Sequence, residues 1–354
     1  MNSNNIRISA LKGYGILLVV IGHAIWSEGT NGGAYSIRNF IYLFHLAIFY
    51  YASGFLYKDK YVVDFKTFLI KRIKSLYIPY VTYGSVFLIL HNIFCYIGLY
   101  SVDTTYSMGE LIKNFFSLLK FNYFEALSGV FWFFKSLFVV SLSFELIVYI
   151  LHKFQYCKLL IIICLGFLSI VGIGACYYSF PCNKTLANLA LLPVFFVGYY
   201  VSRNSICLLR YFKRYRFLVI FACFAILLIN SNYEVSINAQ DIGPNPIIFY
   251  VCAFCGIYLT LYVVDHTPKS LYKWIDYIGK NTAPIFIWHF LFFRIASLII
   301  ILFNRLNINN LKLHPVIPNH NIIWLFIYII IGVGGSLLID KMIKTMKRFF
   351  KEKI

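Results

Sequence analysis

Charged residues are scarce in this chain. Asp, Glu, Lys and Arg together make up 13% of its 354 residues, where a typical soluble domain has roughly a quarter. Apolar residues make up 60%, which is more apolar surface than a soluble core of this size could bury. The scarcity of charge therefore excludes an ordinary soluble domain and indicates a protein that resides in lipid.

The chain also lacks a repeat of fixed period and an appended soluble segment. We therefore expect a single integral-membrane domain over residues 1–354, with a basic cytoplasmic tail at 341–354 that anchors to anionic lipid. Most of the nine cysteines lie in apolar runs. Cys252 and Cys255 have the C-x-x-C spacing found in some metal and redox sites. In an apolar helix the two side chains are expected to pack against neighbouring helices, so no metal is predicted.

Long apolar runs are abundant. A transmembrane helix needs about 20 mostly apolar residues. Ten runs approach this length, at 6–26, 37–57, 76–100, 130–151, 158–180, 186–202, 216–230, 246–264, 283–303 and 320–339. The run at 216–230 is the shortest. Because the runs are continuous and do not alternate between apolar and polar residues, they predict an all-α polytopic fold with about ten transmembrane helices.

The distribution of basic residues sets the orientation. Of 32 Lys and Arg residues, 24 fall on one set of alternate loops and 6 on the other, and Lys135 and Arg294 lie inside predicted spans. Basic residues favour the cytoplasmic side, so both termini are predicted to be cytoplasmic. The net charge of +19 is thereby explained by contacts with membrane lipids, and nucleic acid is not expected as a partner.

Ionisable residues at membrane depth are costly, so they are the first candidates for chemistry. Lys12 and His23 are eleven residues apart, which brings them within about 20 degrees of one face of a helix and roughly 16 Å apart along it. A cation at the cytoplasmic end and an imidazole deeper on the same stripe would suit a thioester of coenzyme A. Gly13 and Gly15 near Lys12 fit helix packing and ligand passage equally well.

A second basic cluster, at 71–74, precedes the third span on the same side. It anchors the membrane topology by itself, but the planar guanidinium of Arg72 could also bind phosphate, with Lys74 beside it. Arg294 and Glu145 are expected to form a buried ion pair with a structural role. The outer segment at 101–129 has the amphipathic spacing of a helix on the membrane surface.

Several segments, taken in order, resemble the integral-membrane acyltransferase family 3, especially its branch similar to fucose 4-O-acetylases. The opening stretch from Arg7 to His23 resembles the family signature, a basic residue and a histidine with ten residues between them, met by Lys12 and His23. The further matching segments are Phe44–Leu56, Lys71–Tyr80, Phe131–Phe138, Pro193–Tyr199 and Ile278–Thr282 with Trp288–His289.

The resemblance implies a membrane O-acyltransferase that moves an acyl group, usually acetyl from acetyl-CoA, to a hydroxyl of a glycan such as a cell-surface polysaccharide or its lipid-linked precursor. It implies that His23 is catalytic, as a general base or through a covalent acetyl-histidine, with Lys12 at the same site. Lys12, Arg72 and Lys74 would bind the phosphates of the donor.

His45 and His289 are expected to orient His23 or to bind the acceptor. Trp132 belongs to the matching Trp-Phe segment, and Lys135 stands where an uncharged residue is expected, which suggests a contact specific to the acceptor.

The loop charges suit a bacterial inner membrane. A transporter or flippase of lipid-linked glycans fits the same spans and buried charges. Such proteins usually have paired broken helices in two related halves, which this sequence does not show.

Overall fold

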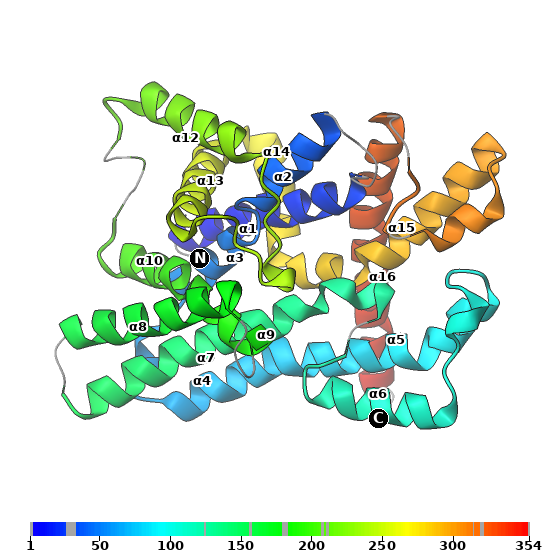
Figure 1. The fold of residues 1–354 in the computed structure, drawn as a ribbon, viewed down its shortest axis with the longest axis horizontal. Helices are drawn as coiled ribbons and strands as arrows, with labels where there is room; N and C mark the ends of the chain where they lie inside the picture. The colour runs from blue at the N-terminus through cyan, green and yellow to red at the C-terminus, as the bar shows by residue number, and fades with distance from the viewer. Residues whose placement is uncertain are drawn as a thin grey trace. The chain divides into compact units, whose positions relative to one another are not determined.

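The computed structural model describes residues 3–25, 33–123, 125–155, 158–178, 183–206, 209, 212–313, 315–318 and 322–352. Within these residues the chain is almost entirely helical and has no β-strand (Figure 1). The helices are α1 (Ser3–Ala24), α2 (Gly33–Tyr42), α3 (Ala47–Phe55), α4 (Phe65–Arg72), α5 (Ile78–Tyr96), α6 (Met108–Leu119), α7 (Trp132–Lys153), α8 (Lys158–Tyr177), α9 (Asn183–Leu186), α10 (Leu192–Arg203), α12 (Arg216–Asn230), α13 (Pro246–His266), α14 (Lys269–Lys280), α15 (Thr282–Asn304) and α16 (Ile322–Glu352).

Eight helical segments of the described chain are long and apolar enough to cross a membrane. They are Ile6–Ala24, Phe65–Tyr96, Ala126–Lys153, Leu159–Tyr177, Lys184–Arg203, Pro246–His266, Thr282–Asn304 and Ile322–Phe349. The prediction of an all-α, multi-pass membrane fold is confirmed. Two of the ten predicted spans are not found as single membrane-crossing helices. The run at 216–230 forms helix α12, which is shorter than a full span, and the run at 37–57 is interrupted.

The interruption lies between α2 and α3, at residues 43–46. The carbonyl oxygen of Ile41 is 3.2 Å from the amide of Phe44, 3.0 Å from that of His45 and 2.9 Å from the Nδ1 atom of His45. A side chain that competes for a backbone carbonyl disturbs a regular helix. Phe44 in this turn fills the space beside Gly256, where a Cβ atom would lie 2.0 Å from its ring. The prediction of one continuous second span is therefore wrong.

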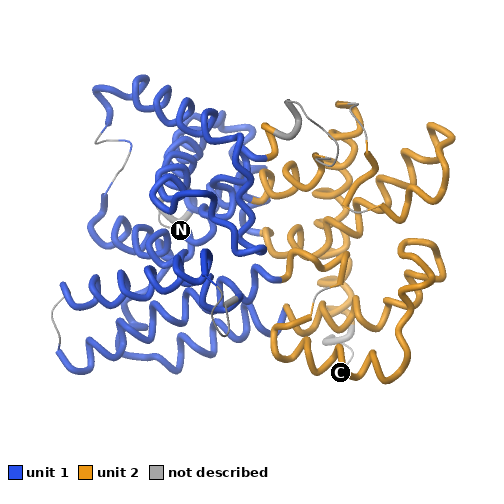
Figure 2. Tube along the Cα trace, viewed as in Figure 1, with its two compact units in different colours: residues 1–15, 39–79, 132–280 blue, residues 16–38, 80–131, 281–354 orange. Residues whose placement is uncertain are grey.

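The chain divides into two compact units whose sequences interleave (Figure 2). Unit 1 contains residues 1–15, 39–79 and 132–280. Within it α3 and α10 are in backbone contact, because a Cβ on Gly54 would lie 1.9 Å from the carbonyl oxygen of Phe195, and one on Gly198 would lie 2.1 Å from that of Tyr51. Small residues allow transmembrane helices to approach this closely.

Unit 2 contains residues 16–38, 80–131 and 281–354. Here α15 packs along α16, and Gly332 of α16 makes room for the ring of Phe293. The helix predicted in the outer segment is α6. It begins with a capping box in which the side chain of Ser107 accepts from the amide of Glu110 and the side chain of Glu110 accepts from the amide of Ser107. Helix α16 continues from its apolar part into the basic tail as far as Glu352.

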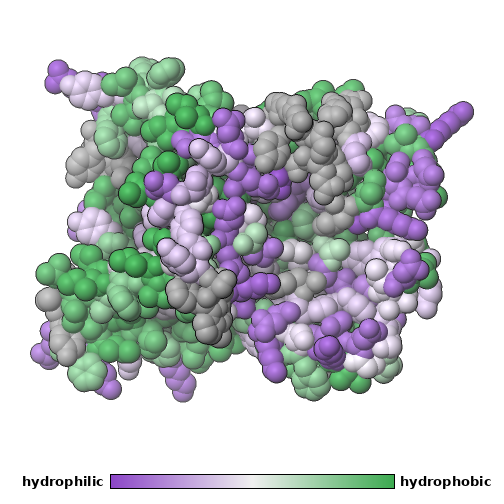
Figure 3. Space-filling view, in the orientation of Figure 1, coloured by the Kyte–Doolittle hydropathy of each residue, from purple (hydrophilic) through white to green (hydrophobic). Residues whose placement is uncertain are grey.

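Large apolar side chains remain exposed along several helices. On α8 these include Leu159, Ile163 and Phe167, at 63%, 55% and 64% exposure. Figure 3 shows apolar side chains gathered where α7 and α8 lie. A soluble monomer rarely exposes apolar patches of this size, so these faces are suited to lipid.

Candidate functional site

Helix α1 contains both residues of the predicted signature, Lys12 and His23, without a break between them. Its first part packs closely on its neighbours. A Cβ on Gly13 would lie 2.2 Å from the carbonyl oxygen of Ile275, and one on Gly15 would lie 3.0 Å from Ile48. Of the two interpretations of these glycines, the structure therefore supports helix packing.

His23 and His289 form the centre of a histidine pair in unit 2. Their ring centroids are 5.6 Å apart with an interplanar angle of 25°. Phe290 closes the group, with its ring 5.0 Å from that of His23 and 4.4 Å from that of His289. Two of the predicted site residues, far apart in the sequence, are thus brought together by α1 and α15. His23 is half-buried and His289 is completely buried.

The hydrogen bonds of His289 determine which of its nitrogens can accept a proton. Its Nδ1 atom lies 2.9 Å from the carbonyl oxygen of Ile285 and 3.1 Å from that of Phe286. A carbonyl can only accept, so Nδ1 must be the donor, and in the neutral ring the lone pair is on Nε2. That Nε2 atom is buried and has no hydrogen-bond partner among the described residues. His289 therefore presents a fixed hydrogen-bond acceptor at the pair.

Aromatic side chains surround the next residue, Trp288. Its ring contacts Tyr83 at 5.4 Å and Phe87 at 5.4 Å. The short 3-10 helix Ala126–Phe131 packs on α15, and a Cβ on its Gly129 would lie 3.7 Å from Phe290. Phe290 and Phe293 in turn pack on His289, so aromatic rings limit the access of water to this buried histidine.

Lys12 lies in unit 1 and has an acidic neighbour on α14. Asp276 is the residue whose charge acts on Lys12. The hydroxyl of Ser9, one turn before Lys12, donates to the backbone carbonyl of Asp276 at 3.2 Å. The proximity of Asp276 to Lys12 was not predicted from the sequence.

Arg72 and Lys74 lie at the junction of α4 and α5, also in unit 1. The Nη2 atom of Arg72 donates to the hydroxyl of Ser53 at 3.1 Å, while its Nε atom is buried without a hydrogen-bond partner in the described residues. Lys74 is exposed within a π-helical turn, Ile73–Tyr77. Pro79 follows this turn and lacks an amide hydrogen, which disturbs the regular bonding of the helix. Direct contact of either residue with Lys12 is not observed in the described part of the chain.

The remaining predicted site residues lie elsewhere in unit 1. His45 is buried in the turn between α2 and α3. Trp132 and Lys135 are half-buried near the start of α7, where the neighbouring Ser136 forms a 2.5 Å hydrogen bond with Tyr50. Their roles at the site stay predictions.

Arg294 and Glu145, expected to pair, each have partners within their own units. The guanidinium of Arg294 donates to the carbonyl oxygens of Leu311, at 2.6 Å, and Leu313. Glu145 accepts from the hydroxyl of Tyr57. A guanidinium in an apolar helix can be satisfied by the carbonyls at the end of a 3-10 helix, here Ile308–Lys312. The pairing of Arg294 with Glu145 stays a prediction.

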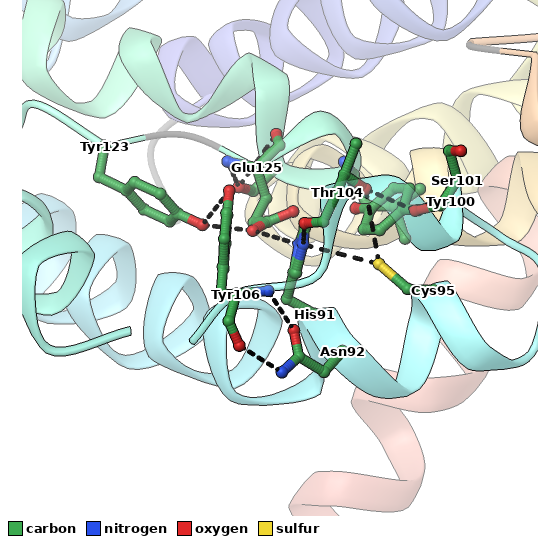
Figure 4. A network of polar contacts seen from close by, with 11 residues as sticks. His91, Asn92, Cys95, Tyr100, Ser101, Thr104, Tyr106, Tyr123 and Glu125 are labelled. Atoms are coloured by element: carbon green, nitrogen blue, oxygen red, sulfur yellow. Dashed lines mark hydrogen bonds and ion pairs between the residues drawn. The ribbon is translucent and has the colours of Figure 1, made fainter. Parts of the chain in front are cut away.

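A buried polar network in unit 2 was missed by the sequence analysis (Figure 4). Nδ1 of His91 lies 2.8 Å from Glu125 Oε1, and its Nε2 lies 2.6 Å from the carbonyl oxygen of Thr104. Tyr106 stacks on His91 at 3.8 Å between centroids. The hydroxyl of Tyr123 donates to Glu125. An acidic residue within the apolar stretch at 121–134 was the available signal.

This network connects the end of α5 to the loop that leads into the 3-10 helix beside Phe290. In the loop between α5 and α6, the side chain of Asn92 bonds both the amide and the carbonyl of Tyr106 at 2.8 Å. Burial raises the pKa of Tyr123, and its hydrogen bond to Glu125 raises it further. Burial also raises the pKa of Tyr100, as does the charge of Glu125. The neutral forms of both phenols are therefore favoured in the folded protein.

In the described part of the chain, no group of three or more His, Cys, Asp or Glu residues is placed to hold a metal ion. The polar chemistry at the histidine pair is instead that of imidazole and backbone groups.

The helices, the lipid-suited faces and the histidine pair together define a multi-pass membrane protein with two histidines in contact in one of its units. A family profile described as an acyltransferase domain matches residues 5–341. The chain therefore belongs to this family, acyltransferase family 3, and acyl transfer is the activity that membership implies. No curated protein and no solved structure matches the chain.

Proposed function

We propose that this protein transfers an acetyl group from acetyl-CoA to a hydroxyl of a cell-surface polysaccharide or of its lipid-linked precursor, in the manner of the fucose 4-O-acetylase-like branch. The observation that supports this most directly is the pairing of His23 with His289 in a buried aromatic surround. The proposed setting is a bacterial inner membrane with both termini cytoplasmic, as the loop charges indicate.

The donor thioester enters from the cytoplasmic end of α1, with its phosphates bound by Lys12, Arg72 and Lys74. The acceptor hydroxyl arrives from the outer side. His23 removes the hydroxyl proton as the oxygen attacks the thioester carbonyl carbon, and a near-neutral imidazole suits this role. The carbon–sulfur bond then breaks, and the leaving thiolate takes the proton from the His23 imidazolium. No proton is gained or lost overall.

His289 supports this reaction through its fixed Nε2 acceptor. A hydroxyl that donates to Nε2 would be held beside the ring of His23, because the two rings stack. His45, Trp132 and Lys135 are proposed to contact the acceptor or to orient the site. Glycan specificity is assigned to Lys135 in particular, because it stands where an uncharged residue is expected.

The test is transfer by the purified protein in lipid nanodiscs. Release of free CoA from acetyl-CoA should depend on an O-deacetylated polysaccharide or lipid-linked glycan, and His23→Ala should abolish it. Translocation of intact glycan by wild type and His23→Ala alike, without CoA release, would contradict the proposal and favour a flippase.

A further inference from the structure

Helices α1 and α14 are in direct backbone contact next to Lys12. A Cβ on Gly279 of α14 would lie 1.7 Å from the carbonyl oxygen of Ser9, and one on Gly13 would lie 2.2 Å from that of Ile275. These contacts fix α14 against the turn of α1 that carries Lys12. Asp276, one residue after Ile275, is therefore held near Lys12 by the packing of two backbones, in agreement with the electrostatic influence of its charge on Lys12.

The two carboxylate oxygens of Asp276 have different surroundings. Oδ2 lies 2.5 Å from Nζ of Lys280, one turn further along α14. Oδ1 is buried and has no hydrogen-bond partner among the described residues. The side chain of Asp276 is 15% exposed, while that of Lys280 is 42% exposed. The carboxylate is therefore largely shielded by protein, while the ammonium group of Lys280 remains accessible to water.

We propose that Lys280 is an additional phosphate-binding residue of the acyl-donor site near Lys12, and that Asp276 is a positioning residue that holds the ammonium group of Lys280 at this site. This inference rests on the proposed function. A carboxylate near two ammonium groups reduces their mutual repulsion in the absence of donor, and the three groups together keep a net positive charge that attracts phosphate.

Lys12 and Lys280 differ in their exposure to water, so they are expected to contact the donor differently. Lys12 is half-buried on α1, whereas Lys280 is exposed at the end of α14. Lys280 can therefore meet an arriving anion first, and its flexible ammonium can turn from Asp276 to a phosphate oxygen without moving either helix.

The test compares two acetyl donors that share the thioester: acetyl-CoA and acetyl-pantetheine, which lacks the phosphates. Lys280→Ala should raise the KM for acetyl-CoA about tenfold, corresponding to one lost charge-assisted contact, with kcat within about twofold of wild type. The KM for acetyl-pantetheine should not change. Lys280→Arg should retain most of the acetyl-CoA affinity. Lys273→Ala, which removes an exposed lysine of the same helix, is the matched control and should behave as wild type.

Asp276→Asn tests the positioning role. It should raise the KM for acetyl-CoA to a similar degree, and its effect should not add to that of Lys280→Ala in the double variant, because residues that act through one another are not independent. Equal KM increases for both donors, no change in Lys280→Ala, or additive effects would each overturn the inference.

A failure of the proposed function would be seen separately, as the absence of acetyl transfer by the wild-type protein. In that event the lysine is tested by the binding of CoA itself. Thermal stabilisation by CoA should be present in wild type and in Lys273→Ala and should be reduced in Lys280→Ala. Equal stabilisation of all three would overturn the phosphate role.

Discussion

Gly279 and Ser9 approach so closely that a single methyl group at residue 279 would lie 1.7 Å from the Ser9 carbonyl oxygen. This contact joins α14 to α1 in the turn before Lys12. Real Cβ atoms do not approach carbonyl oxygens at this distance, so the two helices must separate if the glycine is replaced.

Gly279→Ala is therefore expected to destabilise the protein by about 2–4 kcal/mol, in the range of overpacked buried sites, and to lower acyl transfer as Lys12 moves. Thermal unfolding in nanodiscs measures the first effect. Gly166→Ala is the matched control, because a Cβ there meets nothing within 4 Å and alanine is the better helix former by up to about 1 kcal/mol. Equal melting temperatures for the two variants would contradict the packing argument.

His289→Asn is expected to lower kcat by about 100-fold or more, in the range of lost acid-base or orienting groups. The asparagine amide can still donate to the carbonyl of Ile285, but it has no atom at the position of Nε2. Thermal stability should change little.

His266→Asn provides the matched comparison for this histidine. Nδ1 of His266 is bound to the carbonyl of Tyr262 at 2.8 Å, which repeats the local bond of His289 at an exposed position of α13. Its kcat should equal that of wild type. A similar kcat for both variants would show that Nε2 of His289 takes no part in transfer.

The stability of the buried polar network around His91 and Glu125 is expected to fall at alkaline pH. Burial and Glu125 raise the pKa values of Tyr100 and Tyr123 in the folded state. The contribution of these two phenols to the free energy of unfolding is therefore complete below about pH 10, which is the pKa of tyrosine in the unfolded chain. It is lost as the pH rises above that value through the folded pKa values. Melting temperatures between pH 8 and pH 11 should decline, and Tyr123→Phe should decline less steeply. Parallel curves for wild type and Tyr123→Phe would exclude Tyr123 as the cause.

Arg294→Lys is expected to cost about 1.5–3 kcal/mol, because the hydrogen bonds of a charged donor to buried carbonyls are among the stronger ones. A guanidinium can bond the carbonyls of Leu311 and Leu313 together, and an ammonium on a flexible stem does not match that geometry. Chemical or thermal unfolding measures the change. Arg305→Lys, at the exposed end of the same helix, should be nearly neutral. An equal effect of both substitutions would contradict the structural role of Arg294.

The sequence by itself determined the class of the protein. Apolar runs long enough to cross a bilayer form helices, since every backbone polar group within the lipid must have a hydrogen-bond partner in the protein. The same local logic placed Lys12 and His23 on one helix, because helical spacing needs only the positions of two residues in the chain. The order of short segments such as Lys71–Tyr80 was sufficient to identify the family.

Only the tertiary structure decided which distant residues meet. His289 stacks on His23, the packing of α14 on α1 brings Asp276 near Lys12, and Arg294 donates to backbone carbonyls. In lipid all the spans are similarly apolar, so hydropathy does not specify their neighbours. Helix contacts depend on close packing at single glycines and on the satisfaction of single polar groups. These are properties of two surfaces in three dimensions, and one stretch of sequence does not contain them.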